Sequence, residues 1–263
     1  MKKVVYIVCL IFLSCEEVID VDLQQTLDQI VIDAELSRPI GSEEGQLQVL
    51  VAKTYDFYGS ETPAVTNANI SLHVGDESWN VTHQKEGQYS VDIPSLVADT
   101  SYKLSVEVDG KTYIAEEELV LSGSFDKVVQ GDGQLFSGTE TEALITLTDL
   151  PDLENYYLFD FGYNNLLVTR DRFYDGKEFT FSFFYDDLFP KNTVVNIRMV
   201  GIDEAFFSYM QILLSHSGQN GGGPFAAATS TLLGNFVNPN DETAIALGYF
   251  RVVEQKSLPF TAE

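Results

Sequence analysis

The sequence predicts a mainly β protein: an N-terminal β-sandwich of the immunoglobulin or fibronectin type, followed by a second β-rich domain that carries one helix. Two observations predict this class. From Ile30 onward, apolar and polar residues alternate in short runs, and Gly, Asp and Pro residues separate these runs at short intervals. The composition also fits a packed core, because 44% of the 263 residues are hydrophobic and the chain holds 18 Phe and 13 Tyr.

The first domain is expected over residues 30–122. The clearest alternation runs from Tyr102 to Val108, and Asp109-Gly110 directly after it predicts a tight hairpin whose turn matches the twist of the strands. About seven strands in about ninety residues favour a sandwich. The strands expected in this half cover 30–36, 46–53, 68–74, 78–83, 89–93, 102–108 and 112–115.

The second domain is expected over residues 123–263, after a glycine-rich stretch at 122–138 that we interpret as the domain boundary. A helix is predicted over 203–217, because Asp203 can cap its first turn and apolar residues follow at helical spacing. Gly218 is the expected C-cap. The strands expected in this half cover 142–147, 156–163, 166–170, 179–184, 193–200 and 244–253.

The N-terminus has the features of an export leader. Lys2 and Lys3 precede an apolar run at 4–13, which is too short to cross a bilayer, since a spanning helix needs roughly twenty residues. Ser14-Cys15 then resembles the cleavage and lipidation site of bacterial lipoproteins. We therefore expect a signal peptide at 1–14, a lipid on Cys15 and a tether at 15–29. The alternative is an ordinary secretory signal with a chance cysteine.

The net charge excludes some classes of partner, and the cysteine content excludes an internal disulfide in the mature chain. The formal net charge is -25, which argues against nucleic acid as a partner and against electrostatic adhesion to anionic lipid. The chain has two cysteines, and Cys9 lies in the expected leader, so the mature chain would have no internal disulfide.

The sequence offers little catalytic chemistry. His73, His83 and His216 share no metal-ligand spacing, although His73 and His83 could meet across a hairpin. Ser215 lies outside any nucleophile-elbow motif. The glycines at 218–223 read as a flexible loop rather than a phosphate cradle, because they follow a helix and no lysine comes after them. We expect no catalytic residue, no metal and no cofactor.

Two kinds of side-chain cluster remain. The acidic runs at 116–118 and 186–187 could bind calcium, but neither fits a calcium loop, and a solvated face is favoured. Aromatic residues of the second half could form an exposed patch that contacts a partner. The expected contact residues are Phe173, Tyr174, Phe184, Tyr185, Phe189, Pro224 and Phe225.

An ordered set of short segments spans nearly the whole chain. It comprises residues 15–22 (CEEVIDVD), 30–33 (IVID), 53–54 (KT), 65–70 (VTNANI), 87–89 (GQY), 102–104 (YKL), 113–115 (YIA), 223–225 (GPF), 234–235 (GN) and 246–250 (ALGYF). In this order the segments resemble Bacteroidota lipoproteins of the domain-of-unknown-function family 4249.

The resemblance implies an outer-membrane anchor and a TonB-dependent transporter, or another envelope protein, as partner. Glu16-Glu17 after the cysteine is similar to the surface-export signal of such lipoproteins, which would place the domains outside the cell. No catalytic residue is carried over. We therefore expect a non-enzymatic binding accessory in nutrient or iron-complex uptake. An envelope structural or adhesion protein is the first alternative, and a hydrolase is the second.

Overall fold

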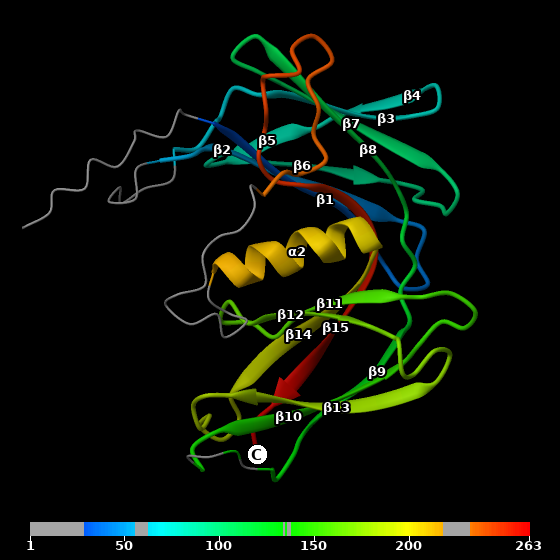
Figure 1. Ribbon diagram of the computed structural model, residues 1–263, viewed down its shortest axis with the longest axis vertical. Helices are drawn as coiled ribbons and strands as arrows, with labels where there is room; N and C mark the ends of the chain where they lie inside the picture. Colours follow the sequence, from blue (N-terminus) through cyan, green and yellow to red (C-terminus); the bar gives the residue numbers. More distant parts are fainter. Residues whose placement is uncertain (1–28, 56–62, 134, 136–137, 218–231) are drawn as a thin grey trace, which may run out of the picture.

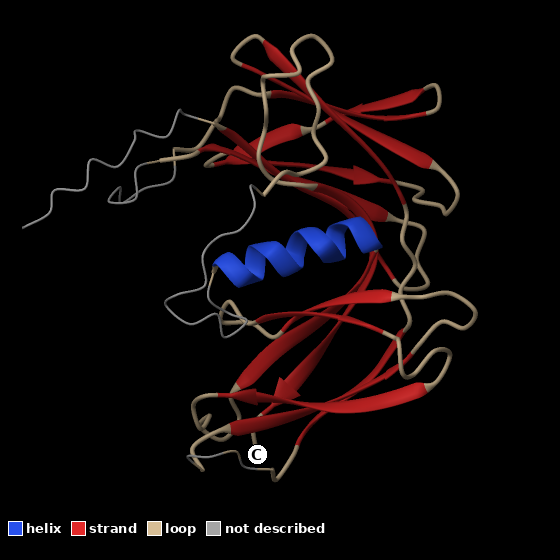
Figure 2. Ribbon diagram, viewed as in Figure 1, coloured by secondary structure: helices blue, strands red, loops and turns tan. Residues whose placement is uncertain are grey.

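The computed structural model describes residues 29–55, 63–133, 135, 138–217 and 232–263, and it arranges them as three β-sheets and one helix (Figure 1). Figure 2 shows how strands dominate the molecule, with the helix lying between an upper and a lower group of strands. The predicted mainly β class with one helix is confirmed. No helix within the described part of the chain is long and apolar enough to cross a membrane.

The strands follow one another along the chain with a single helix near the end. The first half contains β1 (Ile30–Pro39), β2 (Gly45–Lys53), β3 (Asn69–Val74), β4 (Glu77–Asn80), β5 (Thr82–Lys85), β6 (Gln88–Ile93), β7 (Ser101–Val108) and β8 (Lys111–Glu118). The second half contains β9 (Ser124–Gln130), β10 (Thr141–Thr148), β11 (Tyr156–Asp160), β12 (Leu166–Arg170), β13 (Glu178–Tyr185), β14 (Val194–Ile202), α2 (Glu204–His216) and β15 (Phe250–Thr261).

One long sheet joins the two halves of the chain. Its eight strands run in the order β12-β11-β14-β15-β1-β2-β6-β5, and β15 pairs in parallel with β1 from Ala34 opposite Phe250 to Pro39 opposite Gln255. A four-stranded sheet, β4-β3-β7-β8, and a three-stranded sheet, β13-β10-β9, complete the fold. Two separate domains with a boundary near residue 123 stay a prediction, but the sheet itself is continuous across that boundary.

Strand β15 contributes to all three hydrophobic cores. Side chains alternate between the two faces of a strand, so Phe250, Val252, Leu258 and Phe260 share one face of the long sheet. Phe250 and Val252 belong to the first core, between the long sheet and the four-stranded sheet, which together we call the upper sandwich. Phe260 belongs to the second core, between the long sheet and the three-stranded sheet, which we call the lower sandwich, and Leu258 packs against it. Val253 points the other way, into the third core, which contains the buried side chains of α2.

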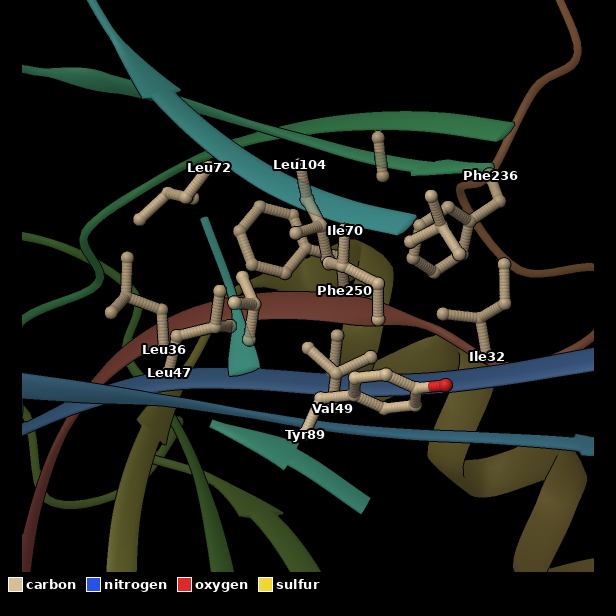
Figure 3. Packing of buried hydrophobic residues seen from close by; sticks show 14 of the residues in the cluster. Ile32, Leu36, Leu47, Val49, Ile70, Leu72, Tyr89, Leu104, Phe236 and Phe250 are labelled. Atoms are coloured by element: carbon tan, nitrogen blue, oxygen red, sulfur yellow. The ribbon is translucent and has the colours of Figure 1, made fainter. Parts of the chain in front are cut away.

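The first core is closed by residues from the far end of the chain. Figure 3 shows Ile32 and Leu47 of the long sheet facing Ile70 and Leu104 of the four-stranded sheet, with Phe250 between the layers. Phe236 also belongs to this core. The N-terminal sandwich is therefore completed by side chains that the sequence places in the second domain.

The predicted strand at 78–83 was wrong, because the chain changes sheets there. β4 belongs to the four-stranded sheet and β5 to the long sheet. Val81 lies between them, is buried, and donates its N–H to the carbonyl of Ile70 at 2.9 Å. As a result His73 lies opposite Ser78 while His83 lies opposite Tyr89, so the two histidines do not meet across a hairpin.

The two largest of the remaining differences concern the expected linker and the last strand. The stretch read as a linker contains β9, whose Phe125 is fully buried and whose ladder pairs with β10. The last strand begins at Phe250 rather than at 244 and continues to Thr261. Gly248 has a φ of +95°, which only glycine adopts readily, and it lies against the backbone of Ile32. This conformation interrupts the extended chain just before β15.

The predicted helix is confirmed. Asp203 is the N-cap, and its carboxylate accepts the backbone N–H of Phe206 at 2.6 Å. The buried face of α2 packs on the long sheet through Phe206, Met210 and Leu214. The helix ends with Ser217 as C-cap, and the expected C-cap Gly218 lies outside the described residues.

Replacing Phe250 tests the shared strand. Phe250→Ala removes a fully buried ring at the start of β15, and we expect a loss of about 3–5 kcal/mol in the free energy of unfolding, measured by urea denaturation. Phe173→Ala is the matched control, because the Phe173 side chain is 87% exposed and its removal should change stability by less than about 0.5 kcal/mol. Equal effects of the two substitutions would contradict this account of the core.

Candidate functional site on the open face of the long sheet

The long sheet has one face that is only partly covered. Residues Asp33 and Glu35 of β1 lie opposite Leu50 and Gln48 of β2, on the side away from the first core. Helix α2 packs on this side over β11, β14 and β15, as its core contacts show (Figure 1). Over β1, β2 and β6 the polar side chains are in contact with solvent, and we call this area the open face.

The open face is hollowed beside the helix. A cavity of about 380 Å³ lies there, and a neighbouring one of about 570 Å³ shares Gln46 and Gln48 with it and continues toward Asp92. The first cavity is lined mainly by polar side chains: Asp33, Glu35, Gln46, Gln48, Gln84, Gln88, Ser90, Arg198 and Arg251. Together the two hollows form a polar groove across β1, β2 and β6.

A network of four charged side chains forms one wall of the groove. Glu35 accepts hydrogen bonds from Arg251 Nε at 2.9 Å and from Arg198, and Arg251 also pairs with Asp33 at 2.6 Å. The Arg251 guanidinium lies over the Phe206 ring of α2, 5.2 Å from its centroid. The network therefore connects β1, β14 and β15 with the helix.

Electrostatics favour the ionised forms of Glu35 and Arg251. Burial acts to raise the pKa of Glu35, but the charges of Arg251 and Arg198 outweigh it and the pKa is lowered. Burial acts to lower the pKa of Arg251, and the carboxylates of Asp33 and Glu35 reverse this and raise it. The wall is thus charged but internally paired, with its side chains held in place by mutual hydrogen bonds.

Amide groups form the exposed floor. Gln48 donates to Gln46 at 2.7 Å, and Gln46 donates to Asp92 at 2.8 Å. Glutamine side chains carry both donors and acceptors, so this surface can hydrogen-bond to a polar partner such as a peptide segment or a sugar. The groove therefore offers hydrogen-bonding groups that suit binding of a polar partner.

A second, acidic hollow lies where β8 approaches the start of α2. Glu117, Glu118 and Asp203 line a cavity of about 530 Å³. Burial raises the pKa of Glu117 to about 7, the hydrogen bond from Asn235 at 2.7 Å opposes this, and the charges of Asp203 and Glu118 add to it. The run at 116–118 was expected to be a solvated face, and this holds for Glu116 and Glu118, but Glu117 is half-buried.

The structure also brings together three carboxylates that the sequence did not indicate. One oxygen each of Asp149, Asp171 and Asp175 lies within 4.8 Å of the others. Asp149 and Asp171 are buried and Asp175 is exposed. Asp149 is separated from Asp171 and Asp175 by the strand pair β11 and β12, so no local motif in the sequence joins the three residues.

The aromatic residues expected to contact a partner do not form one exposed patch. The Phe173 side chain is 87% exposed, whereas Tyr174 and Tyr185 are buried in the second core. Phe184 and Phe189 are half-buried. Of the remaining expected site residues, Cys15, Pro224 and Phe225 lie outside the described residues. Contact with a partner stays a prediction, and among the described residues Phe173 offers the largest free surface for it.

Substitution of Glu35 tests the charged wall. Glu35→Gln keeps the shape but leaves two arginines short of a charge partner, so we expect a loss of about 2–3 kcal/mol at pH 7 in urea unfolding. Because the folded pKa of Glu35 is lowered, its contribution is complete above its unfolded pKa of about 4.3 and is lost as the pH falls through the folded value. The difference between wild type and variant should therefore shrink between pH 6 and pH 3.

Glu44→Gln is the control for this experiment, since Glu44 is exposed on the loop before β2 and takes part in none of the ion pairs of the charged wall. We expect it to change stability by less than about 0.5 kcal/mol at either pH. A Glu35→Gln effect that is constant across this pH range would contradict the assignment.

Comparison with known proteins places the chain in a family. No curated protein matches it. Among solved structures, the selenomethionine-substituted chicken interferon gamma receptor alpha chain is similar over 66% of this chain and 88% of that one, with 9% identity and a TM-score of 0.19, which is too low to carry structural weight. A family model described as a domain of unknown function, DUF4249, matches residues 16–258. The chain therefore belongs to the DUF4249 family.

Proposed function

We propose that this protein is a lipid-anchored outer-membrane protein of Bacteroidota, exposed at the cell surface, and that it works by binding. In this proposal it is a non-enzymatic accessory to a TonB-dependent transporter in nutrient or iron-complex uptake. The observation that carries the proposal is the N-terminal pattern: two lysines, an apolar run at 4–13, and Ser14-Cys15 followed by Glu16.

Charge explains why such a protein would need a covalent anchor. The full chain has a formal net charge of -25, so its acidic body is repelled by anionic headgroups and its attachment would depend on acyl chains. A single acyl chain gives only marginal binding, whereas several give stable attachment. From Cys15 to Gln29 the chain can reach about 45–50 Å when extended, which would leave the body free to approach a neighbouring protein.

The polar groove supports the binding part of the proposal. It lies on a regular sheet whose strands are held on their other face by the first core, so its shape is set before a partner arrives. Its amide groups and its internally paired charges suit a hydrogen-bonding partner surface better than an apolar one. The proposed contact with the transporter is therefore placed on the open face.

Removing the cysteine tests the anchor. Cys15→Ala should abolish acylation, so the variant should move from the detergent phase to the aqueous phase in detergent partitioning, and mass spectrometry should find no acyl chains. Cys9→Ala is the matched control, because Cys9 lies within the apolar run of the expected leader. If Cys15→Ala partitioned like the wild type, the lipid anchor would have to be abandoned.

Copurification tests the partner. We expect the native protein, extracted from membranes in detergent, to bring a TonB-dependent transporter with it. Gln48→Lys combined with Gln88→Lys should reduce this recovery about tenfold or more, since both side chains line the groove. Glu116→Gln combined with Glu118→Gln also changes the net charge by two positive units, and both residues are exposed outside the groove, so this pair is the charge-matched control.

Uptake and adhesion assays of a deletion strain separate the proposal from its alternative. Loss of uptake with an intact envelope supports the transport accessory. Altered adhesion or cell shape with normal uptake, together with recovery of no transporter, would instead favour an envelope structural protein.

A further inference from the structure

Three carboxylates meet at one end of the lower sandwich. Asp149 directly follows β10, Asp171 directly follows β12, and Asp175 lies in the turn that leads to β13. One oxygen of each lies within 4.8 Å of the others. β10 belongs to the three-stranded sheet and β12 to the edge of the long sheet, so the cluster lies between the two layers.

The two inner carboxylates are removed from water. Asp149 is 4% exposed and Asp171 is 2% exposed, while Asp175 is exposed. Buried carboxylates are ordinarily paired with a cation or bound to a metal. Yet the ion pairs found among the described residues include none of these three.

One oxygen of Asp171 lacks a partner, although a backbone hydrogen bond from Asn155 reaches the same carboxylate. Asp149 accepts the Tyr157 hydroxyl through one oxygen and the backbone N–H of Gly176, at 2.9 Å, through the other. Asp175 accepts the N–H of Asp152 at 3.2 Å. The Oδ2 atom of Asp171 is fully buried and accepts no hydrogen bond from any described residue. An uncompensated buried oxygen of this kind is costly.

A second buried oxygen without a partner belongs to the same turn. The Tyr174 hydroxyl is also buried and has no hydrogen-bond partner in good geometry. Burial raises its pKa, a hydrogen bond with the Thr169 side chain lowers it, and the charges of Asp149 and Asp171 raise it further. Burial raises the pKa of Asp171 as well, and the backbone hydrogen bond from Asn155 opposes this. The charge of Asp149, a hydrogen bond with it and the charge of Asp175 add to the rise.

We propose that Asp149, Asp171 and Asp175 hold a divalent cation of the hard, oxygen-binding class, Ca²⁺ or Mg²⁺. Carboxylate oxygens suit these ions, whereas Zn²⁺ and copper sites usually contain His or Cys ligands. The exposed position of Asp175 leaves one side of the ion for water ligands. The competing explanation is a proton shared between Asp149 and Asp171, which would also remove the repulsion between them.

A bound cation would stabilise the lower sandwich. It would connect the turn at 171–177 to the end of β10, beside the hydrogen bonds that Asp149 already accepts from Tyr157 and Gly176. An ion that binds only the folded state raises the melting temperature in proportion to the logarithm of its concentration. Stability is therefore the direct readout of the site.

Two measurements on the full-length protein in detergent test the proposal. In thermal melts, a few millimolar Ca²⁺ or Mg²⁺ should raise the melting temperature by on the order of 5 °C over the protein in EDTA. In luminescence, Tb³⁺ should emit when Tyr157 and Tyr174 are excited, and Ca²⁺ should quench that emission by competition. Asp171→Asn should remove both responses, and Asp186→Asn, in an exposed acidic pair elsewhere, should keep them.

Three results would overturn the proposal: no response of the wild type to either ion, an unchanged response in Asp171→Asn, or a response to Zn²⁺ alone. A shared proton predicts the first of these together with a higher melting temperature of Asp171→Asn in EDTA. If Asp171→Asn does not fold, Asp175→Asn gives the same test at the exposed ligand, where the substitution leaves the buried groups unchanged.

Discussion

The parallel pairing of β15 with β1 is the interaction on which the rest of the structure depends. It joins strands more than two hundred residues apart and converts two groups of strands into one eight-stranded sheet. Since the upper and lower sandwiches use the same face of this sheet, their separation is set by the length of β15. Without this pairing, the upper core would lose Phe250 and Val252, and the helix would lose part of the surface on which it packs.

Charge pairs fix the register of that pairing on both faces of the sheet. Glu35 lies directly opposite Arg251 and is hydrogen-bonded to it, and Arg38 lies directly opposite Glu254 with a 2.6 Å contact. Glu254 is buried between the two sandwich cores and also accepts the N–H of Ser122. A shift of one residue would reverse the faces of these side chains and bury charge without a partner, so the pairs contribute specificity as well as stability.

The arrangement separates three roles in space. The predicted anchor precedes β1, the open face carries a polar groove beside the helix, and the carboxylate cluster lies at the end of the lower sandwich next to Gly123. Binding at the groove would leave the cores undisturbed, because the groove residues point away from them. The proposed cation at the carboxylates would stabilise the lower sandwich. Neither Asp149 nor Asp171 lines the groove.

The sequence by itself determined the local features. Alternation over β7 and the Asp203 cap of α2 each depend on residues that are close neighbours in the chain. Only the tertiary structure decided which strands pair. At Val81, for example, one continuous alternation of apolar and polar residues is divided between β4 and β5, which belong to different sheets. A period of two shows which side of a strand is apolar but not which strand lies beside it. For the same reason the groove, the Glu35 network and the Asp149 cluster could not be predicted, since their members are assembled from distant segments by that pairing.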